Sequence, residues 1–110
     1  MPTITLKHHN RQFDLEEEAR DLNSDEAIQR ARAFGLEGWT FDVAYLDREG
    51  GMIMNGPMGW QHFRNATCGY GGVGVQASAE ILAMFDFGDY DELFERIRFG
   101  GDTAHFVIYR

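Results

Sequence analysis

Hydrophobic and polar residues alternate at the start of the chain in the pattern of a β-hairpin. Residues 3–8 (TITLKH) alternate polar positions with largely apolar ones, and a polar break at residues 9–11 separates them from a second short segment at residues 12–15. Alternation with a period of two is typical of strands that bury one face. We therefore predict an opening hairpin.

A second hairpin is predicted in the middle of the chain. Residues 39–46 (WTFDVAYL) predict a strand, and the residues on one of its faces would be Trp39, Phe41, Val43 and Tyr45. Turn-forming residues at 47–51 (DREGG) precede residues 52–54, which we expect to return antiparallel. Residues 103–109 predict a last strand.

The first predicted helix spans residues 25–34. Asn23 followed by Glu26 has the spacing of a capping box, and Gly35 supplies a left-handed stop. The apolar residues between these signals recur at helical spacing, and we assign them to the core: Ala27, Ile28, Ala31 and Phe34.

Two more helices are predicted in the second half of the chain. Residues 75–85 are apolar nearly all round, so we expect a mostly buried helix that ends near Gly88. Asp89 and Glu92 repeat the capping-box spacing, and the glycines at 100–101 end a third helix. Its apolar face would consist of Tyr90, Leu93, Phe94 and Ile97.

This order of elements predicts an α+β fold in a single small domain that spans residues 1–110. We expect an antiparallel or mixed sheet of about five strands with about three helices packed on one face. The chain has 110 residues, of which 44% are hydrophobic, and this is enough apolar material for one core.

The sequence favours a cytoplasmic protein without membrane association. No stretch reaches the roughly 18 apolar residues of a membrane span, and the first residues lack the apolar run of a signal peptide. The single cysteine, Cys68, has no partner for an internal disulfide, which favours a reducing compartment.

Acidic residues outnumber basic ones by eighteen to ten, which gives a formal net charge of −8. Such a charge repels nucleic acid and attracts basic protein surfaces, although it also serves solubility alone. We therefore expect no direct binding of nucleic acid. As a candidate partner-binding surface we select the acidic residues Glu16, Glu17, Glu18, Asp86, Asp89, Asp91 and Glu92.

A glycine-rich segment precedes the second predicted helix. Gly69, Gly71 and Gly74 satisfy the spacing G-x-G-x-x-G, and backbone N–H groups at a helix start can hold a phosphate. The chain is too short for a dinucleotide-binding fold, and the glycines equally suit close packing of the helix on the sheet. A nucleotide at this loop would contact Tyr70, Gly71, Gly72, Gly74, Arg64 and His62, with Tyr70 stacking on the base.

Residues 68–82 (CGYGGVGVQASAEIL) resemble the W-G-Y-G-G-S-G-P box and following Ala/Leu-rich helix of small uncharacterised domains found in bacteria, phages and plasmids. The resemblance covers about a seventh of the chain, and the family has Trp and Pro at the positions of Cys68 and Val75. It implies a mobile-element setting and brings no known activity or functional residue with it.

The sequence contains no recognisable catalytic arrangement. Cys68 follows His62 by six residues without a third orienting residue, and the four histidines lack metal-ligand spacing. We therefore expect no enzyme activity, no cofactor and no metal.

The leading hypothesis is a small acidic binding protein that inhibits or neutralises a partner with a basic surface, such as a nuclease or a defence-complex subunit. A phage anti-defence inhibitor such as an anti-CRISPR fits this description, and so does a toxin-immunity protein. The alternative is a nucleotide- or phosphate-binding module that sequesters a signalling nucleotide. Two further questions stay open at this point. One is whether the chain forms a homodimer. The other is whether four apolar residues belong to the core or to an interface: Met52, Met54, Met58 and Trp60.

Overall fold

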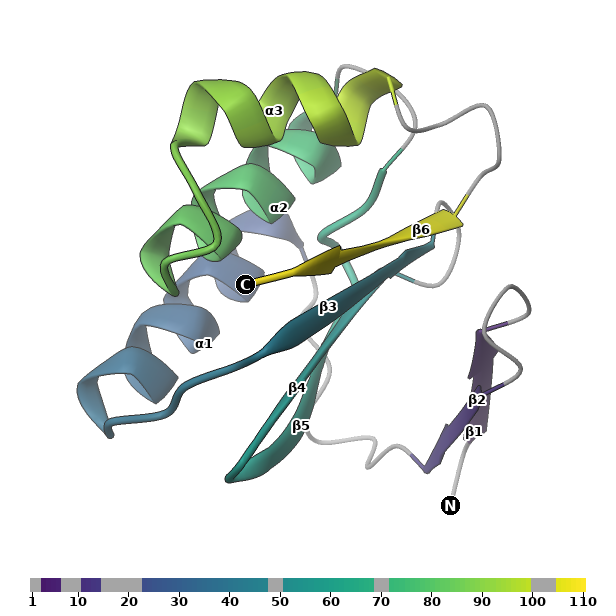
Figure 1. Cartoon of the computed structure of the whole chain (residues 1–110), viewed down its shortest axis with the longest axis vertical. Coiled ribbons are helices and arrows are strands. Elements are labelled where there is room, and N and C mark those ends of the chain that lie inside the picture. The colour runs from purple at the N-terminus through teal and green to yellow at the C-terminus, as the bar shows by residue number, and fades with distance from the viewer. Residues whose placement is uncertain (1–2, 7–10, 15–22, 48–50, 69–71, 100–104) are drawn as a thin grey trace.

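Three helices pack against one face of an antiparallel sheet in the computed structural model (Figure 1). The structure describes residues 3–6, 11–14, 23–47, 51–68, 72–99 and 105–110. Its elements in chain order are β1 (Thr3–Leu6), β2 (Arg11–Asp14), α1 (Ser24–Leu36), β3 (Val43–Asp47), β4 (Gly51–Gly56), β5 (Gly59–Phe63), α2 (Val73–Met84), α3 (Tyr90–Phe99) and β6 (His105–Tyr109). The predicted α+β fold with helices on one face is confirmed.

The described strands form two separate sheets. Strands β1 and β2 pair only with each other, with Ile4 opposite Phe13, and the other four are ordered β5-β4-β3-β6 with every neighbour antiparallel. The structure contains both predicted hairpins and the predicted last strand, and it contains one further strand, β5, that the sequence did not predict. This strand follows β4 through a turn at Pro57 and Met58, and Gly59 with φ +119° takes the conformation that L-residues avoid.

Helix α1 begins where the capping signal predicted. The Asn23 side chain accepts a hydrogen bond of 2.9 Å from the backbone N–H of Glu26, and Ala27 and Ala31 are fully buried. The predicted stop at Gly35 is wrong, because the helix continues through Gly35 to Leu36. The left-handed conformation falls instead on Gly38, with φ +87°.

The predicted strand at 39–46 starts later than expected, at Val43. Phe41 is fully buried beside Phe85, with ring centroids 4.9 Å apart, and belongs to the core under the helices. Val43 and Tyr45 belong to a second cluster on the other side of the sheet. The prediction that all four alternating residues share a face is therefore wrong, because the chain becomes a regular strand only after Phe41.

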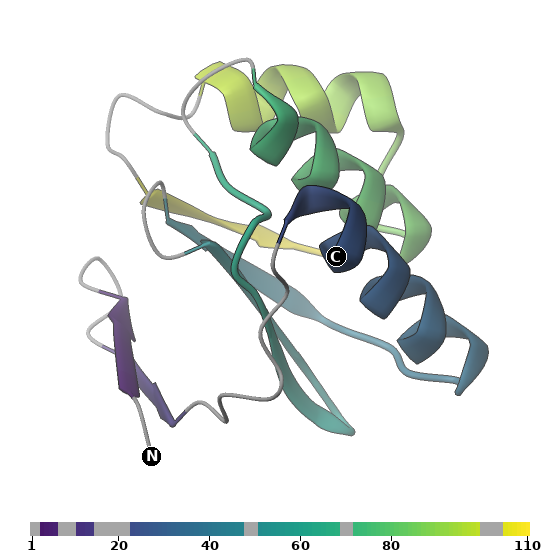
Figure 2. The same ribbon diagram turned by 180° about the vertical axis from the view of Figure 1, so that it is seen from behind.

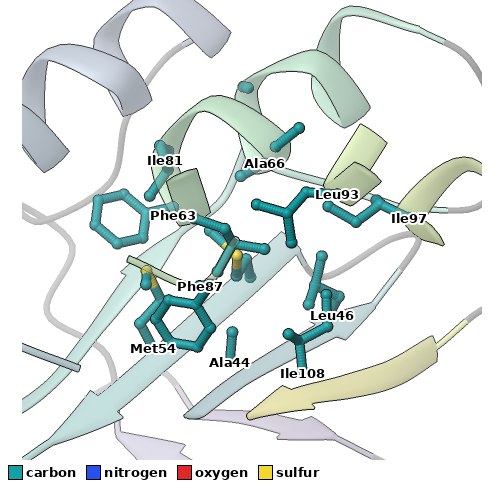
Figure 3. Packing of buried hydrophobic residues seen from close by; sticks show 14 of the residues in the cluster. Ala44, Leu46, Met54, Phe63, Ala66, Ile81, Phe87, Leu93, Ile97 and Ile108 are labelled. Carbon is teal, nitrogen blue, oxygen red and sulfur yellow. The ribbon is translucent and has the colours of Figure 1, made fainter. Parts of the chain in front are cut away.

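Helix α2 lies at the centre of the helical layer (Figures 1 and 2). Seven of its residues are buried, as the apolar pattern predicted: Gly74, Val75, Ala77, Ser78, Ala79, Ile81 and Leu82. Figure 3 shows Ile81 above Phe63 and Met54 of the sheet, with Leu93 and Ile97 of α3 reaching the same core. Packing around α2 thus joins all three helices to the sheet.

The opposite face of the four-stranded sheet carries its own apolar cluster, which we call the outer face. It consists of Val43, Tyr45, Ile53, Trp60 and Val107. The alternation of side chains along the strands separates the four residues that were open between core and interface. Met52 and Met54 are fully buried on the helix side of the sheet, and Trp60 lies on the outer face. Met58, in the turn, is half exposed.

Replacement of Gly51 by Ala is expected to destabilise the fold more than the same change at Gly38. Both glycines have φ +87°, so both variants bear the strain of a left-handed L-residue, about 1–2 kcal/mol. A Cβ at Gly38 meets nothing within 4 Å, whereas one at Gly51 would lie 2.5 Å from the backbone oxygen of Phe63. Overpacking adds about 1–3 kcal/mol. Urea unfolding checks the difference, and equal losses of unfolding free energy would contradict the register between β4 and β5.

Candidate functional site

The glycine-rich segment ends in the first turn of α2. Gly69, Tyr70 and Gly71 lie outside the described residues, so the structure places only Gly72 and Gly74 of this motif. Gly72 is the N-cap residue of α2, with an extended backbone and no side chain to cap the first turn. The start of α2 therefore lacks the side-chain acceptor that Asn23 supplies to α1.

Gly74 ties the start of α2 to the segment that follows β5. Its carbonyl accepts the backbone N–H of Thr67 at 3.1 Å, and the hydroxyl of Ser78 lies 2.7 Å from the Thr67 carbonyl. Gly74 and Ser78 are both buried. These contacts hold the start of α2 against the segment that follows β5.

The structure separates His62 from the start of α2. His62 pairs with Ile53 in the register of β4 and β5 and alternates with Phe63, so it lies on the outer face, where it is 6% exposed. Its backbone carbonyl accepts a hydrogen bond of 3.0 Å from Arg30. Arg64 is exposed directly after β5. The structure therefore does not place the His62 side chain at the start of α2, where the sequence predicted a shared nucleotide site.

A shallow depression lies between the starts of α1 and α2, and sequence reasoning missed it. It has a volume of about 270 Å³ and is lined by Asn23, Ser24, Asp25, Asn65 and Val73. The Ser24 hydroxyl reaches the Asn65 carbonyl at 3.3 Å. Two helix starts favour an anion, but the carboxylate of Asp25 opposes it, and the Asn23 side chain is already engaged as a cap.

Four carboxylates gather where α2 ends and α3 begins, and we call them the acidic corner: Asp86, Asp89, Asp91 and Glu92. All four are exposed, and none forms an ion pair with another described residue. Asp91 and Glu92 occupy the first turn of α3, where negative charge suits the positive end of the helix. The other predicted acidic residues, Glu16, Glu17 and Glu18, lie outside the described part of the chain.

The backbone holds the acidic corner in a fixed turn. Asp86 adopts a left-handed conformation with φ +67°, and the N–H of Phe87 bonds to the Leu82 carbonyl at 3.0 Å. Phe87 and Leu93, on either side of the turn, are buried in the core. Their burial anchors the segment that carries Asp89, Asp91 and Glu92.

The remaining candidate chemistry is sparse within the described residues. Cys68 is fully buried, and no group of three or more His, Cys, Asp and Glu in the described ranges could hold a metal ion. Among the described helices, none is long and apolar enough to cross a membrane.

Comparison with known proteins assigns no relative to the chain. No protein-family model matches it, and no significant match occurs among curated proteins or solved structures.

Replacement of Ser78 by Ala is expected to lower the unfolding free energy by about 1–2 kcal/mol, because it removes the short hydrogen bond that the buried Ser78 hydroxyl donates to the Thr67 carbonyl. Urea unfolding measures the loss. Gln76→Ala is the matched control, since Gln76 is exposed on the same helix and its replacement should change stability by less than about 0.5 kcal/mol. Equal effects of the two substitutions would show that the hydrogen bond between Ser78 and Thr67 does not stabilise the fold.

Proposed function

We propose that this chain is a small acidic, non-enzymatic binding protein that inhibits or neutralises a partner protein with a basic surface. The acidic corner carries the proposal, because four exposed carboxylates without ion pairs to described residues leave their charge available to a partner. The formal net charge of −8 adds a long-range attraction that speeds encounter with a basic site.

The elements on either side of the acidic corner support this function. A binding surface is more effective when its side chains stand on elements that do not rearrange on association. Leu93 and Ile97 anchor α3 in the core, and Phe87 anchors the turn before it. The carboxylates thus stand at fixed positions before any partner arrives.

The partner class follows from the charge. A basic surface that binds nucleic acid, as in a nuclease or a defence-complex subunit, is complementary to a row of carboxylates. The resemblance of residues 68–82 to small domains of phages and plasmids agrees with a phage anti-defence inhibitor such as an anti-CRISPR, and a toxin-immunity protein has the same physical requirements. A cytoplasmic location is part of this proposal.

A second candidate function is a nucleotide- or phosphate-binding module, favoured by one observation. The start of α2 has no side-chain cap, and a helix start without one suits an external acceptor such as a phosphate. Under this proposal Gly72 and Gly74 contact the phosphate, and Tyr70 stacks on the base.

Neutralising the acidic corner is expected to weaken binding of the partner. The variant Asp86→Asn, Asp89→Asn, Asp91→Asn and Glu92→Gln keeps side-chain size and removes four charges. Exposed ion pairs contribute about 0.2–1 kcal/mol each, so the dissociation constant should rise about fourfold or more at low salt and less at high salt. Binding is measured by calorimetry with the partner that copurifies with the tagged chain and is identified by native mass spectrometry.

The matched control neutralises four carboxylates elsewhere, at Asp25, Glu37, Asp42 and Glu80, and has the same net charge. Asp25 lies in the first turn of α1, Glu37 is the C-cap residue of α1, Asp42 precedes β3 and Glu80 lies on α2. Asp42 and Glu80 pair with Arg110 and Arg32, so the unfolding free energy of this control is measured alongside its binding. If both variants weaken binding equally, only total charge matters and the acidic corner is not the binding surface.

The nucleotide alternative predicts an effect of Gly72→Leu. Gly72 has φ −116°, which any residue adopts, so the added side chain should obstruct a phosphate without straining the backbone. Native mass spectrometry of protein recovered gently from cells should then lose an adduct of nucleotide mass, whereas Gln76→Leu should retain it. Absence of such an adduct from the unmodified protein would reject this alternative.

A further inference from the structure

The four-stranded sheet ends in two edge strands, β5 on one side and β6 on the other (Figure 1). An edge strand presents backbone N–H and C=O groups that no neighbouring strand engages, and native proteins cover or block such edges. The described residues treat the two edges of this sheet differently, and this difference indicates where a further strand can pair.

The hydrogen-bond pattern shows which backbone groups of β6 face away from the sheet. The N–H of Arg110 donates to the Asp42 carbonyl at 2.9 Å, and the two residues lie opposite each other when the register of β3 and β6 is continued by one position. In an antiparallel pair, residues that exchange hydrogen bonds with the neighbour alternate with residues that do not. The N–H and C=O groups of His105, Val107 and Tyr109 therefore point away from β3.

The edge of β5 is blocked by a side chain of α1. Four residues lie in one row across the sheet: Val107, Tyr45, Ile53 and His62. By the same alternation the backbone of His62 faces away from β4, and its carbonyl accepts a hydrogen bond of 3.0 Å from Arg30. The Arg30 guanidinium also lies over the ring of Phe63, 5.2 Å from its centroid. A further strand at this edge would have to displace Arg30.

The edge of β6 has no such block within the described residues. No described side chain hydrogen-bonds to the backbone of Val107 or Tyr109. Tyr109 is 73% exposed, and residues 105–109 include no proline, lysine or carboxylate, which are the residues that commonly protect an edge. The backbone of β6 is thus able to accept another strand.

We propose that β6 pairs antiparallel with β6 of a second copy of this chain, so that the two four-stranded sheets join edge to edge. The outward backbone groups recur at every second residue and are centred on Val107. A two-fold axis through Val107 therefore places Val107 opposite itself and His105 opposite Tyr109 of the second copy. Each of these pairs exchanges both of its backbone hydrogen bonds.

Two features favour a second copy over an unrelated strand. Chains with a net charge of −8 repel each other, and β6 brings no carboxylate of its own into the contact. Because Arg30 blocks β5, pairing through β6 also leaves the four-stranded sheet no second open edge, and assembly closes at two copies. The proposal does not depend on the proposed function, since the acidic corner lies on α2 and α3.

Sedimentation equilibrium of the full chain tests the pairing. The unmodified chain is expected to approach twice its monomer mass as the concentration rises through the micromolar range. Val107→Pro removes one outward N–H from each copy and no bond to β3, so the dissociation constant of the dimer should rise about tenfold or more. Val107→Thr is the matched control, because it keeps the N–H and the branched Cβ, and it should leave the constant nearly unchanged.

A second pair of variants keeps the test decisive if proline at position 107 unfolds the strand. Tyr109→Pro also removes an outward N–H, at an exposed position near the end of β6, and Tyr109→Ala is its control because it retains the N–H. Urea unfolding at a concentration where the unmodified chain is monomeric shows whether each variant keeps its fold.

Disulfide formation tests the register. The two-fold axis places the Cα atoms of two cysteines introduced at Val107 about 5.5 Å apart, which is within the range of a disulfide. Val107→Cys should therefore give a crosslinked dimer on mild oxidation. Tyr109→Cys should not, because the same register separates the two cysteines by about 13 Å along the strands. The native Cys68 is fully buried, and the unmodified chain is the control for its oxidation.

Four outcomes overturn the proposal or a part of it. A chain that stays monomeric through the micromolar range overturns the pairing, and so does a dimer that neither folded proline variant weakens, because another surface would then hold it. Equal crosslinking at positions 107 and 109 overturns the register. A mass well above that of two copies overturns the block at β5.

Discussion

Burial of α2 is the constraint on which the rest of the structure depends. The helix presents small or branched apolar residues around most of its circumference and packs against α1, α3 and the sheet. A helix without a polar face is stable only when other elements surround it. The other two helices are amphipathic because each has to cover one side of α2, and the sheet closes the layer from below.

The same burial explains the connections at the two ends of α2. At its start, Gly74 and Ser78 bind the backbone of Thr67, so polar groups that enter the core have partners. At its end, Asp86 turns left-handed and Phe87 folds back to the Leu82 carbonyl. The exposed carboxylates lie immediately after this turn, and their placement is therefore a consequence of how the central helix is terminated.

Much of the fold could be predicted from the sequence, because its signals are local. The Asn23 cap, the two hairpins and the apolar surface of α2 depend on spacing within a few residues, and the structure contains each of them. The errors arose where a neighbour far along the chain decides the outcome. Phe41 and Val43 are two positions apart, as residues on one face of a strand would be, but Phe41 packs against Phe85 in the helix-side core.

The candidate site was predictable to a smaller extent for the same reason. His62 lies near the glycines in the sequence, but the alternation of side chains along β5 places it on the outer face of the sheet. The depression between α1 and α2 joins residues about 40 positions apart, such as Ser24 and Asn65. The acidic corner was recognisable because its members are adjacent in the chain, but its exposure depends on which side of α3 the core occupies.

The small side chains in the helix-side core also constrain how this protein can evolve. Ala27 and Ala31 of α1 and Ala77 and Ala79 of α2 are all buried in one cluster, so an added methyl group finds no free volume there. A larger residue on one helix becomes tolerable only when its neighbour shrinks. In a lineage of such proteins these positions would therefore change in compensating pairs, while the exposed residues around α3 could vary independently and allow one scaffold to acquire different surfaces.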